Sequence, residues 1–150
     1  MSNENCYCVK VLVSEIEIAI RFSETDAMGV VWHGNYLKFF EDAREKFGAD
    51  YGIEYMDAYN AGFYTPIVNS EISHKASVYY GQKIKVKTIL EQRASSKIVF
   101  RYEVHIVETG ELAATGATTQ VFLGIESRML ELNKPKFFAD WEANQNWIEE

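Results

Sequence analysis

Residues 24–44 read Glu-Thr-Asp-Ala-Met-Gly-Val-Val-Trp-His-Gly-Asn-Tyr-Leu-Lys-Phe-Phe-Glu-Asp-Ala-Arg, and this stretch is the most informative part of the chain. A carboxylate, Asp26, lies on a glycine-containing turn, and His33 follows seven positions later. An amphipathic helix is predicted to open at Asn35. A carboxylate can activate water, and unpaired backbone N–H groups at a helix start can hold a developing oxyanion, so the stretch suits acyl chemistry.

The predicted helix runs from Asn35 to about Gly48. Asn35 is a good N-terminal capping residue, and Gly48 suits a C-terminal stop. Apolar side chains recur at helical spacing along this segment at Tyr36, Phe39, Phe40, Ala43 and Phe47. Such a stripe must be buried against another element.

Alternating apolar and polar residues predict strands on both sides of this helix. They lie at about residues 11–22, 66–76, 83–90, 97–106 and 113–123. In the first strand the apolar face extends to Phe22, and in the last strand alternate residues from Ala113 to Leu123 share one face. The order strand, helix and four strands at hairpin spacings predicts an α+β fold, in which a curved antiparallel sheet of about five strands wraps one helix.

Length and composition indicate one globular domain over residues 1–150, with an N-terminal segment at 1–10. The tail at 128–150 is predicted to hold a helix that docks on the body through aromatic side chains. The net charge of −7 argues against a nucleic-acid surface. No apolar run reaches the roughly 18 residues that a membrane span needs. The N-terminus lacks the basic start and apolar stretch of a signal peptide, so a cytoplasmic location is expected.

The cysteine and histidine residues do not predict a metal site. Cys6 and Cys8 are one residue apart, a spacing at which a disulfide is strained, so two reduced thiols are expected. His33, His74 and His105 are scattered along the chain. No metal and no cofactor are predicted.

The stretch at 24–44 resembles the hotdog-fold acyl-CoA thioesterases of the YbgC / 4-hydroxybenzoyl-CoA thioesterase type. The match runs through Thr25, Asp26, Ala27, Gly29, Val30, Val31, His33, Tyr36, Phe39, Phe40, Glu41, Ala43 and Arg44. Glu24, Met28 and Trp32 depart from the family pattern. Weaker similarity at residues 74–82 and 93–103 follows in the expected order, so the resemblance covers about residues 13–124 and implies the hotdog fold.

The resemblance implies roles for residues of the first motif. Asp26 would be the general base or the nucleophile toward the thioester carbonyl, although an aspartate in such a loop also commonly caps its own turn. His33 would orient the water or the acid, or polarise the thioester oxygen. The alternative for His33 is a structural hydrogen-bonding role. Backbone amides near His33, Gly34 and Asn35 are the expected oxyanion donors.

Three further assignments are weaker. Glu41 is a secondary catalytic candidate because a different hotdog clan places its catalytic Glu on this helix. The alternative is an ion pair with Arg44 or Lys38 on a solvated face. Tyr36 belongs to the core or lines the acyl pocket. A basic hairpin turn is the best candidate for binding CoA phosphates, the alternative being a solvated turn, and its residues are Arg93, Ser95, Ser96 and Lys97.

The sequence therefore predicts an acyl-CoA thioesterase that releases free acid and CoA, with acyl-carrier protein as the alternative carrier. Hotdog protomers usually pair with joined sheets and an active site between subunits, so a homodimer or homotetramer is expected. Two alternatives stay open on the same fold. One is an acyl-thioester dehydratase, and the other is a non-catalytic module that binds acyl-CoA or acyl-carrier protein. The sequence does not identify the acyl group.

Overall fold

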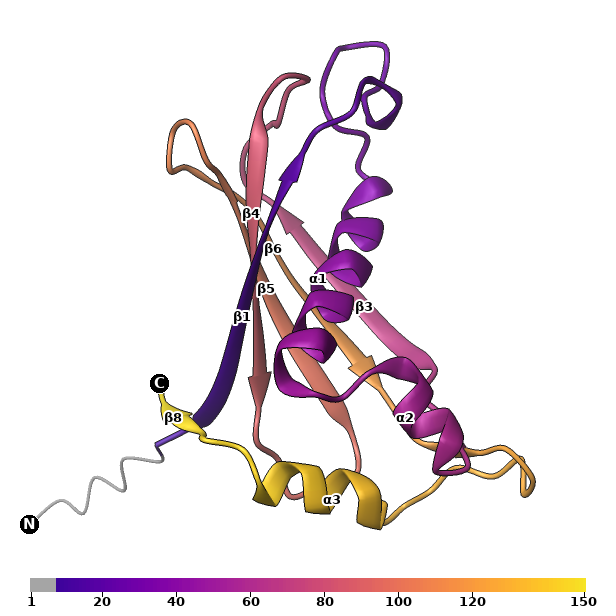
Figure 1. Cartoon of the computed structure of the whole chain (residues 1–150). Helices are drawn as coiled ribbons and strands as arrows, with labels where there is room; N and C mark the ends of the chain where they lie inside the picture. Colours follow the sequence, from indigo (N-terminus) through magenta and orange to yellow (C-terminus); the bar gives the residue numbers. More distant parts are fainter. Residues whose placement is uncertain (1–7) are drawn as a thin grey trace, which may run out of the picture.

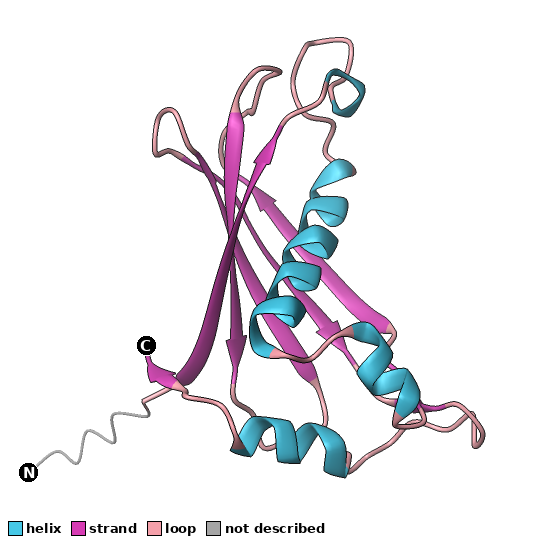
Figure 2. Cartoon of the chain, viewed as in Figure 1, coloured by secondary structure: helices cyan, strands magenta, loops and turns pink. Residues whose placement is uncertain are grey.

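A long helix, α1 (Asn35–Tyr51), lies in the concave face of an antiparallel sheet in the computed structural model, which describes residues 8–150 (Figure 1). Five long strands build this sheet: β1 (Lys10–Ala19), β3 (Ile67–His74), β4 (Lys83–Glu91), β5 (Ile98–Ile106) and β6 (Leu112–Gln120). The short strand β8 (Ile148–Glu149) adds to one edge, giving the order β3-β6-β5-β4-β1-β8. The smaller elements are the 3-10 helix η1 (Phe22–Glu24), α2 (Tyr55–Asn60), α3 (Lys136–Ala143), and a two-stranded pair of β2 (Phe63–Tyr64) and β7 (Leu123–Gly124). Figure 2 shows α1 along one side of the sheet, α2 and α3 at its lower end, and the short η1 in the loop at its upper end.

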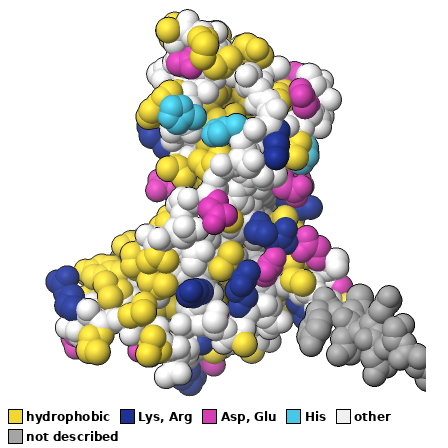
Figure 3. Space-filling model, turned by 180° about the vertical axis from the view of Figure 1, so that it is seen from behind, with side chains coloured by type: hydrophobic (Ala, Val, Ile, Leu, Met, Phe, Trp, Pro, Cys, Tyr) yellow, Lys and Arg dark blue, Asp and Glu magenta, His cyan; other side chains and the backbone are white. Residues whose placement is uncertain are grey.

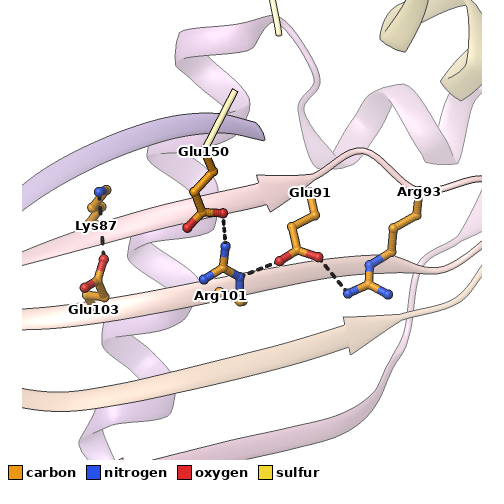
Figure 4. Close-up of polar contacts among 6 residues, drawn as sticks. All are labelled: Lys87, Glu91, Arg93, Arg101, Glu103 and Glu150. Carbon is orange, nitrogen blue, oxygen red and sulfur yellow. Dashed lines mark hydrogen bonds and ion pairs between the residues drawn. The ribbon is translucent and has the colours of Figure 1, made fainter. Parts of the chain in front are cut away.

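The convex face of the sheet carries charged side chains of opposite sign on neighbouring strands. Lys87 lies 3.8 Å from Glu103 across β4 and β5. Arg101 bridges Glu91 at 2.7 Å and Glu150 at 2.5 Å, which ties the C-terminal end of the chain to the sheet (Figure 4). Cross-strand pairs of opposite charge stabilise register, and they keep this face in water.

The aromatic stripe of α1 forms the centre of the core, as the helical spacing predicted. Phe39, Phe40 and Phe47 are each at most 1% exposed. Phe40 stacks on Tyr102 of β5 with ring centroids 4.1 Å apart and planes 7° from parallel. This contact depends on Gly116 of β6, where an added Cβ would lie 2.5 Å from the Phe40 ring.

The predicted start of the helix at Asn35 is confirmed, whereas its predicted capping residue and C-terminal end are wrong. Asn35 is the first helical residue and Gly34 occupies the capping position. At the other end, α1 continues past Gly48 to Tyr51 and stops at Gly52, whose φ of +68° favours glycine. Gly48 is small for a different reason, because a Cβ there would lie 2.7 Å from the Ile53 carbonyl oxygen.

Two predicted strand faces also differ from the structure. Phe22 was expected on the apolar face of the first strand, but β1 ends at Ala19 and Phe22 is 76% exposed. In β6, the side chains of Ala114 and Thr118 point into the core. The alternate residues 115, 117 and 119, which were predicted to share one face, lie on the other side of the strand. A register shift between Val104 and His105 explains why Ala113 is also fully buried.

The C-terminal tail closes the lower end of the molecule in Figure 1. In α3, Trp141 donates a hydrogen bond from Nε1 to the Tyr51 carbonyl at 2.8 Å, and Phe138 packs 5.4 Å from Phe122. The strand β8 was not predicted. Within residues 8–150, no helix is long and apolar enough to cross a membrane. Cys6 lies outside the described residues.

Candidate active site

Asp26 both caps its turn and keeps a carboxylate oxygen available. Its Oδ1 accepts hydrogen bonds from the amides of Met28 at 2.8 Å and Val30 at 3.4 Å. The Asp26 amide donates to the Val30 carbonyl at 2.8 Å, which closes the loop. Oδ2 has no hydrogen-bond partner among residues 8–150, and the side chain is only partly buried. The turn-capping interpretation is therefore correct for one oxygen, and the other is in a position to meet water.

The side chain of Asn35 fastens the start of α1 to the loop that carries Asp26. Asn35 is 7% exposed, and its Nδ2 donates to the Glu24 carbonyl at 2.7 Å. The Trp32 amide donates to the same carbonyl at 2.9 Å. The Val31 amide donates to the Val78 carbonyl at 2.8 Å, which joins the loop to the segment before β4. The sequence suggested a capping role for the Asn35 side chain and an oxyanion role for its amide, so this anchoring contact was missed.

Two backbone amides at the helix start have no acceptor within the described part of the chain. They are the amides of His33 and Gly34. In contrast, the Asn35 amide donates to the Trp32 carbonyl at 2.9 Å, and the Tyr36 amide donates to the His33 carbonyl at 3.4 Å. Successive unpaired amides at a helix N-terminus form an anion site, so His33 and Gly34 are better placed as oxyanion donors than Asn35.

The indole of Trp32 lies over Gly34. A Cβ at Gly34 would be 2.3 Å from the Trp32 ring, so glycine is needed for this close approach. The Trp32 and His33 rings are 5.0 Å apart. The imidazole of His33 is exposed, and no hydrogen bond or ion pair joins it to Asp26 within residues 8–150. The two predicted catalytic residues therefore share a loop without direct contact.

A second imidazole lies near the helix start. His74, at the end of β3, packs edge-to-face on Tyr36 with ring centroids 4.9 Å apart. Tyr36 itself is 3% exposed, and burial raises the pKa of its hydroxyl. His74 could be predicted only weakly from the sequence, because its separation from Tyr36 along the chain hides the contact.

Glu41 and Arg44 behave differently although they are one turn apart. Glu41 is 70% exposed and lies 3.9 Å from Arg44, as expected for a solvated ion pair. Arg44 instead points inward, where Nη1 donates to the Tyr102 hydroxyl at 3.1 Å and lies 3.4 Å from the Thr118 hydroxyl. Burial raises the pKa of Tyr102, and the charge of Arg44 opposes that rise.

The predicted CoA-binding turn lies far from Asp26 within one protomer. Arg93, Ser95, Ser96 and Lys97 occupy the turn between β4 and β5. Arg93 pairs with Glu91 at 2.9 Å (Figure 4), and the Ser96 hydroxyl donates to the Glu131 carbonyl at 3.2 Å. The loop that carries Asp26 lies beside the start of β4 and the turn follows the end of β4, so strand geometry separates them by about 27 Å.

Comparison with known proteins places this geometry in a family. Residues 20–145 match the thioesterase-like superfamily. The chain belongs to this superfamily. It is 34% identical over 131 residues to the putative acyl-CoA thioesterase YneP of Bacillus subtilis, covering 87% of this chain and 94% of that protein.

Solved structures agree with this membership of the thioesterase-like superfamily. The DHNA-CoA thioesterase from Staphylococcus aureus is 35% identical, with a TM-score of 0.78 and 87% of each chain covered. The 4-hydroxybenzoyl CoA thioesterase from Pseudomonas sp. strain CBS-3 has a TM-score of 0.75 over 87% of this chain and 97% of that chain. At 20% identity, it supports the fold alone. The predictions of a hotdog-fold thioesterase family and of an α+β fold are confirmed.

Proposed function

We propose that this protein hydrolyses acyl-CoA thioesters at the start of α1. The observation that carries this proposal is the pairing, on one loop, of an available Asp26 oxygen with the unpaired amides of His33 and Gly34. Its relatives support the reaction, since one is named a putative acyl-CoA thioesterase and another a DHNA-CoA thioesterase.

The reaction follows from this geometry. The thioester carbonyl oxygen accepts hydrogen bonds from the two amides, and each such donor stabilises the developing oxyanion by about 3 kcal/mol. Asp26 removes a proton from water as the new carbon–oxygen bond forms, and the carbon–sulfur bond then breaks to release the CoA thiolate. In the nucleophilic alternative, the Asp26 carboxylate attacks the carbonyl and expels the CoA thiolate, and water then cleaves the mixed anhydride to release the acid and regenerate Asp26. His33 lies at the loop surface, where it can orient the water.

A homodimer would bring the two halves of the CoA site together. The strand β3 is a sheet edge, and all of its side chains except Ile72 are exposed, including Val68 at 59%. Exposed edge strands pair readily with another strand. Antiparallel pairing of two β3 strands turns the second copy end for end. Its β4–β5 turn then lies toward the loop of the first copy that carries Asp26 and His33, the catalytic loop of this proposal. A tetramer of such dimers is the alternative assembly.

The oligomer is tested by mass in solution. A dimer of the 17.2 kDa chain would have twice that mass by light scattering, and Val68→Lys is expected to shift it toward monomer. A wild-type mass of one chain would contradict the proposal.

Hydrolysis is tested by thiol release from short-chain, long-chain and aryl acyl-CoAs. Release of free thiol with free acid supports it, whereas formation of an enoyl thioester would indicate a dehydratase. Tight binding without turnover would indicate a binding module.

Arg93→Gln is expected to raise KM for CoA substrates about threefold to tenfold with little change in kcat, as for loss of one phosphate contact. The matched control is Lys136→Gln, because Lys136 is 88% exposed and lies on α3.

A further inference from the structure

A hollow of about 600 Å³ lies beside the C-terminal half of α1. Its walls come from α1, α2, α3 and the inner face of the sheet, and they include the rings of Phe122, Phe138 and Trp141. Apolar side chains also gather at the lower end of the molecule in Figure 3. The size falls within the range of roughly 300–1,000 Å³ typical of small-molecule sites.

The hollow contains one largely buried cation, Arg44, whose nearest carboxylate, that of Glu41, is exposed to water. Its side chain is 15% exposed. The groups that it reaches inside the protein are the neutral hydroxyls of Tyr102 and Thr118, at 3.1 and 3.4 Å. Within the described residues, the carboxylate in ion-pair range is that of Glu41, at 3.9 Å, and it is 70% exposed to water. Buried charges are normally paired, so a guanidinium in this state favours an anionic partner.

We propose that this hollow binds an apolar carboxylate, whose carboxyl group pairs with Arg44 and whose apolar body contacts the rings of α3. Arginine suits this role because its planar fork matches a carboxylate. Two further acids, Glu45 and Glu54, line the opening. Both are exposed, and the Glu54 side chain caps the start of α2. Water screens exposed charges far more than buried ones, so the desolvated Arg44 makes the electrostatic potential inside the hollow positive.

This site is separate from the catalytic loop within one protomer. Arg44 follows Asn35 by nine residues, which is about 14 Å along the helix axis. A two-ring aromatic acid or a medium-chain alkanoate fits the apolar walls and the single cation. Hydrolysis of an acyl-CoA also releases a carboxylic acid, so the product belongs to the same ligand class. That last point rests on the proposed function, whereas binding itself does not.

The test compares 2-naphthoate with its neutral amide by calorimetry, which needs no turnover. Wild type is expected to bind the carboxylate at least tenfold more tightly. Arg44→Met should remove this preference, and Arg44→Lys should keep part of it. Glu41→Gln should tighten carboxylate binding because it removes the competing acid. Lys136→Gln is the control for an exposed cation outside the hollow.

Three results would overturn the proposal: no saturable binding, equal binding of acid and amide, or a preference that survives Arg44→Met. If Arg44→Met does not fold, as judged by circular dichroism, then Arg44→Lys and Glu41→Gln decide the matter. Asp26→Asn should retain carboxylate binding. Its loss in that variant would place the acid at the catalytic loop instead, and would do so whether or not the protein hydrolyses thioesters.

Discussion

The side chain of Asn35 is predicted to hold the catalytic loop in its working position, and its substitution by Asp isolates that effect. Asn35 is buried, and its Nδ2 donates to the Glu24 carbonyl at 2.7 Å. Asn35→Asp keeps the size of the side chain but replaces the donor by a carboxylate that faces a carbonyl oxygen. The same change places a negative charge at a helix N-terminus, which is favourable.

The expected cost follows from these opposing effects. Loss of the hydrogen bond costs about 1 kcal/mol, and an unpaired charge at a buried site costs roughly 1–3 kcal/mol more. The helix dipole returns about 0.5 kcal/mol. The net loss is about 1.5–3.5 kcal/mol, or roughly 3–14 °C in Tm for a chain of this size. Asn35→Ala should lose only about 1 kcal/mol, because Glu24 still accepts the Trp32 amide at 2.9 Å.

Thermal and urea unfolding, with thiol release in parallel, measure this prediction. The penalty belongs to the charged form of the introduced carboxylate, so it is present at neutral pH and shrinks as the pH falls and the group protonates. Asn133→Asp is the matched control, because it makes the same change at an exposed asparagine outside the strands of the sheet. If Asn35→Asp were as stable and active as the control at pH 7, the anchoring role of Asn35 would be refuted.

Three further predictions concern packing and pH. Gly116→Ala should cost about 1–3 kcal/mol in urea unfolding, because its Cβ would lie 2.5 Å from the Phe40 ring; a neutral result would show that the ring moves freely. Burial raises the pKa of Tyr102, so the contribution of its protonated hydroxyl to stability is complete below about pH 10 and is lost as the pH rises through the folded-state pKa. Tyr102→Phe should therefore flatten the alkaline part of the plot of stability against pH, and an unchanged plot would contradict this. Gly34→Ala should displace the Trp32 ring, which is 50% exposed, and change tryptophan fluorescence with a stability loss below about 1 kcal/mol; an unaltered spectrum would contradict the close contact.

The sequence predicted the central helix and the sheet well because their patterns are local. The stripe that contains Phe39, Phe40 and Phe47 is buried, as helical periodicity requires. The helix end was misplaced because two glycines satisfy different demands. Gly48 makes room for the Ile53 carbonyl, and Gly52 supplies the left-handed turn. Sequence alone does not separate close approach from chain reversal.

Contacts between distant segments explain the remaining differences. The hydroxyls of Tyr102 and Thr118 meet Arg44 from two strands far along the chain, so the inward turn of that arginine has no local signal. Likewise, the basic turn at Arg93 was predicted as part of the site, but the strand direction carries it to the other end of the protomer. Its role in CoA binding stays a prediction that depends on the second copy.

Thiol release by wild type and Asp26→Asn tests the central claim most directly. Asn keeps the size of the side chain and can still accept the Met28 amide, which bonds Oδ1 at 2.8 Å, so the turn should remain folded. The account predicts turnover of at least one acyl-CoA by wild type and a fall of about a hundredfold or more in the variant, the scale of losing an acid–base group. Unchanged turnover in a folded Asp26→Asn protein would contradict the account and direct attention to Glu41.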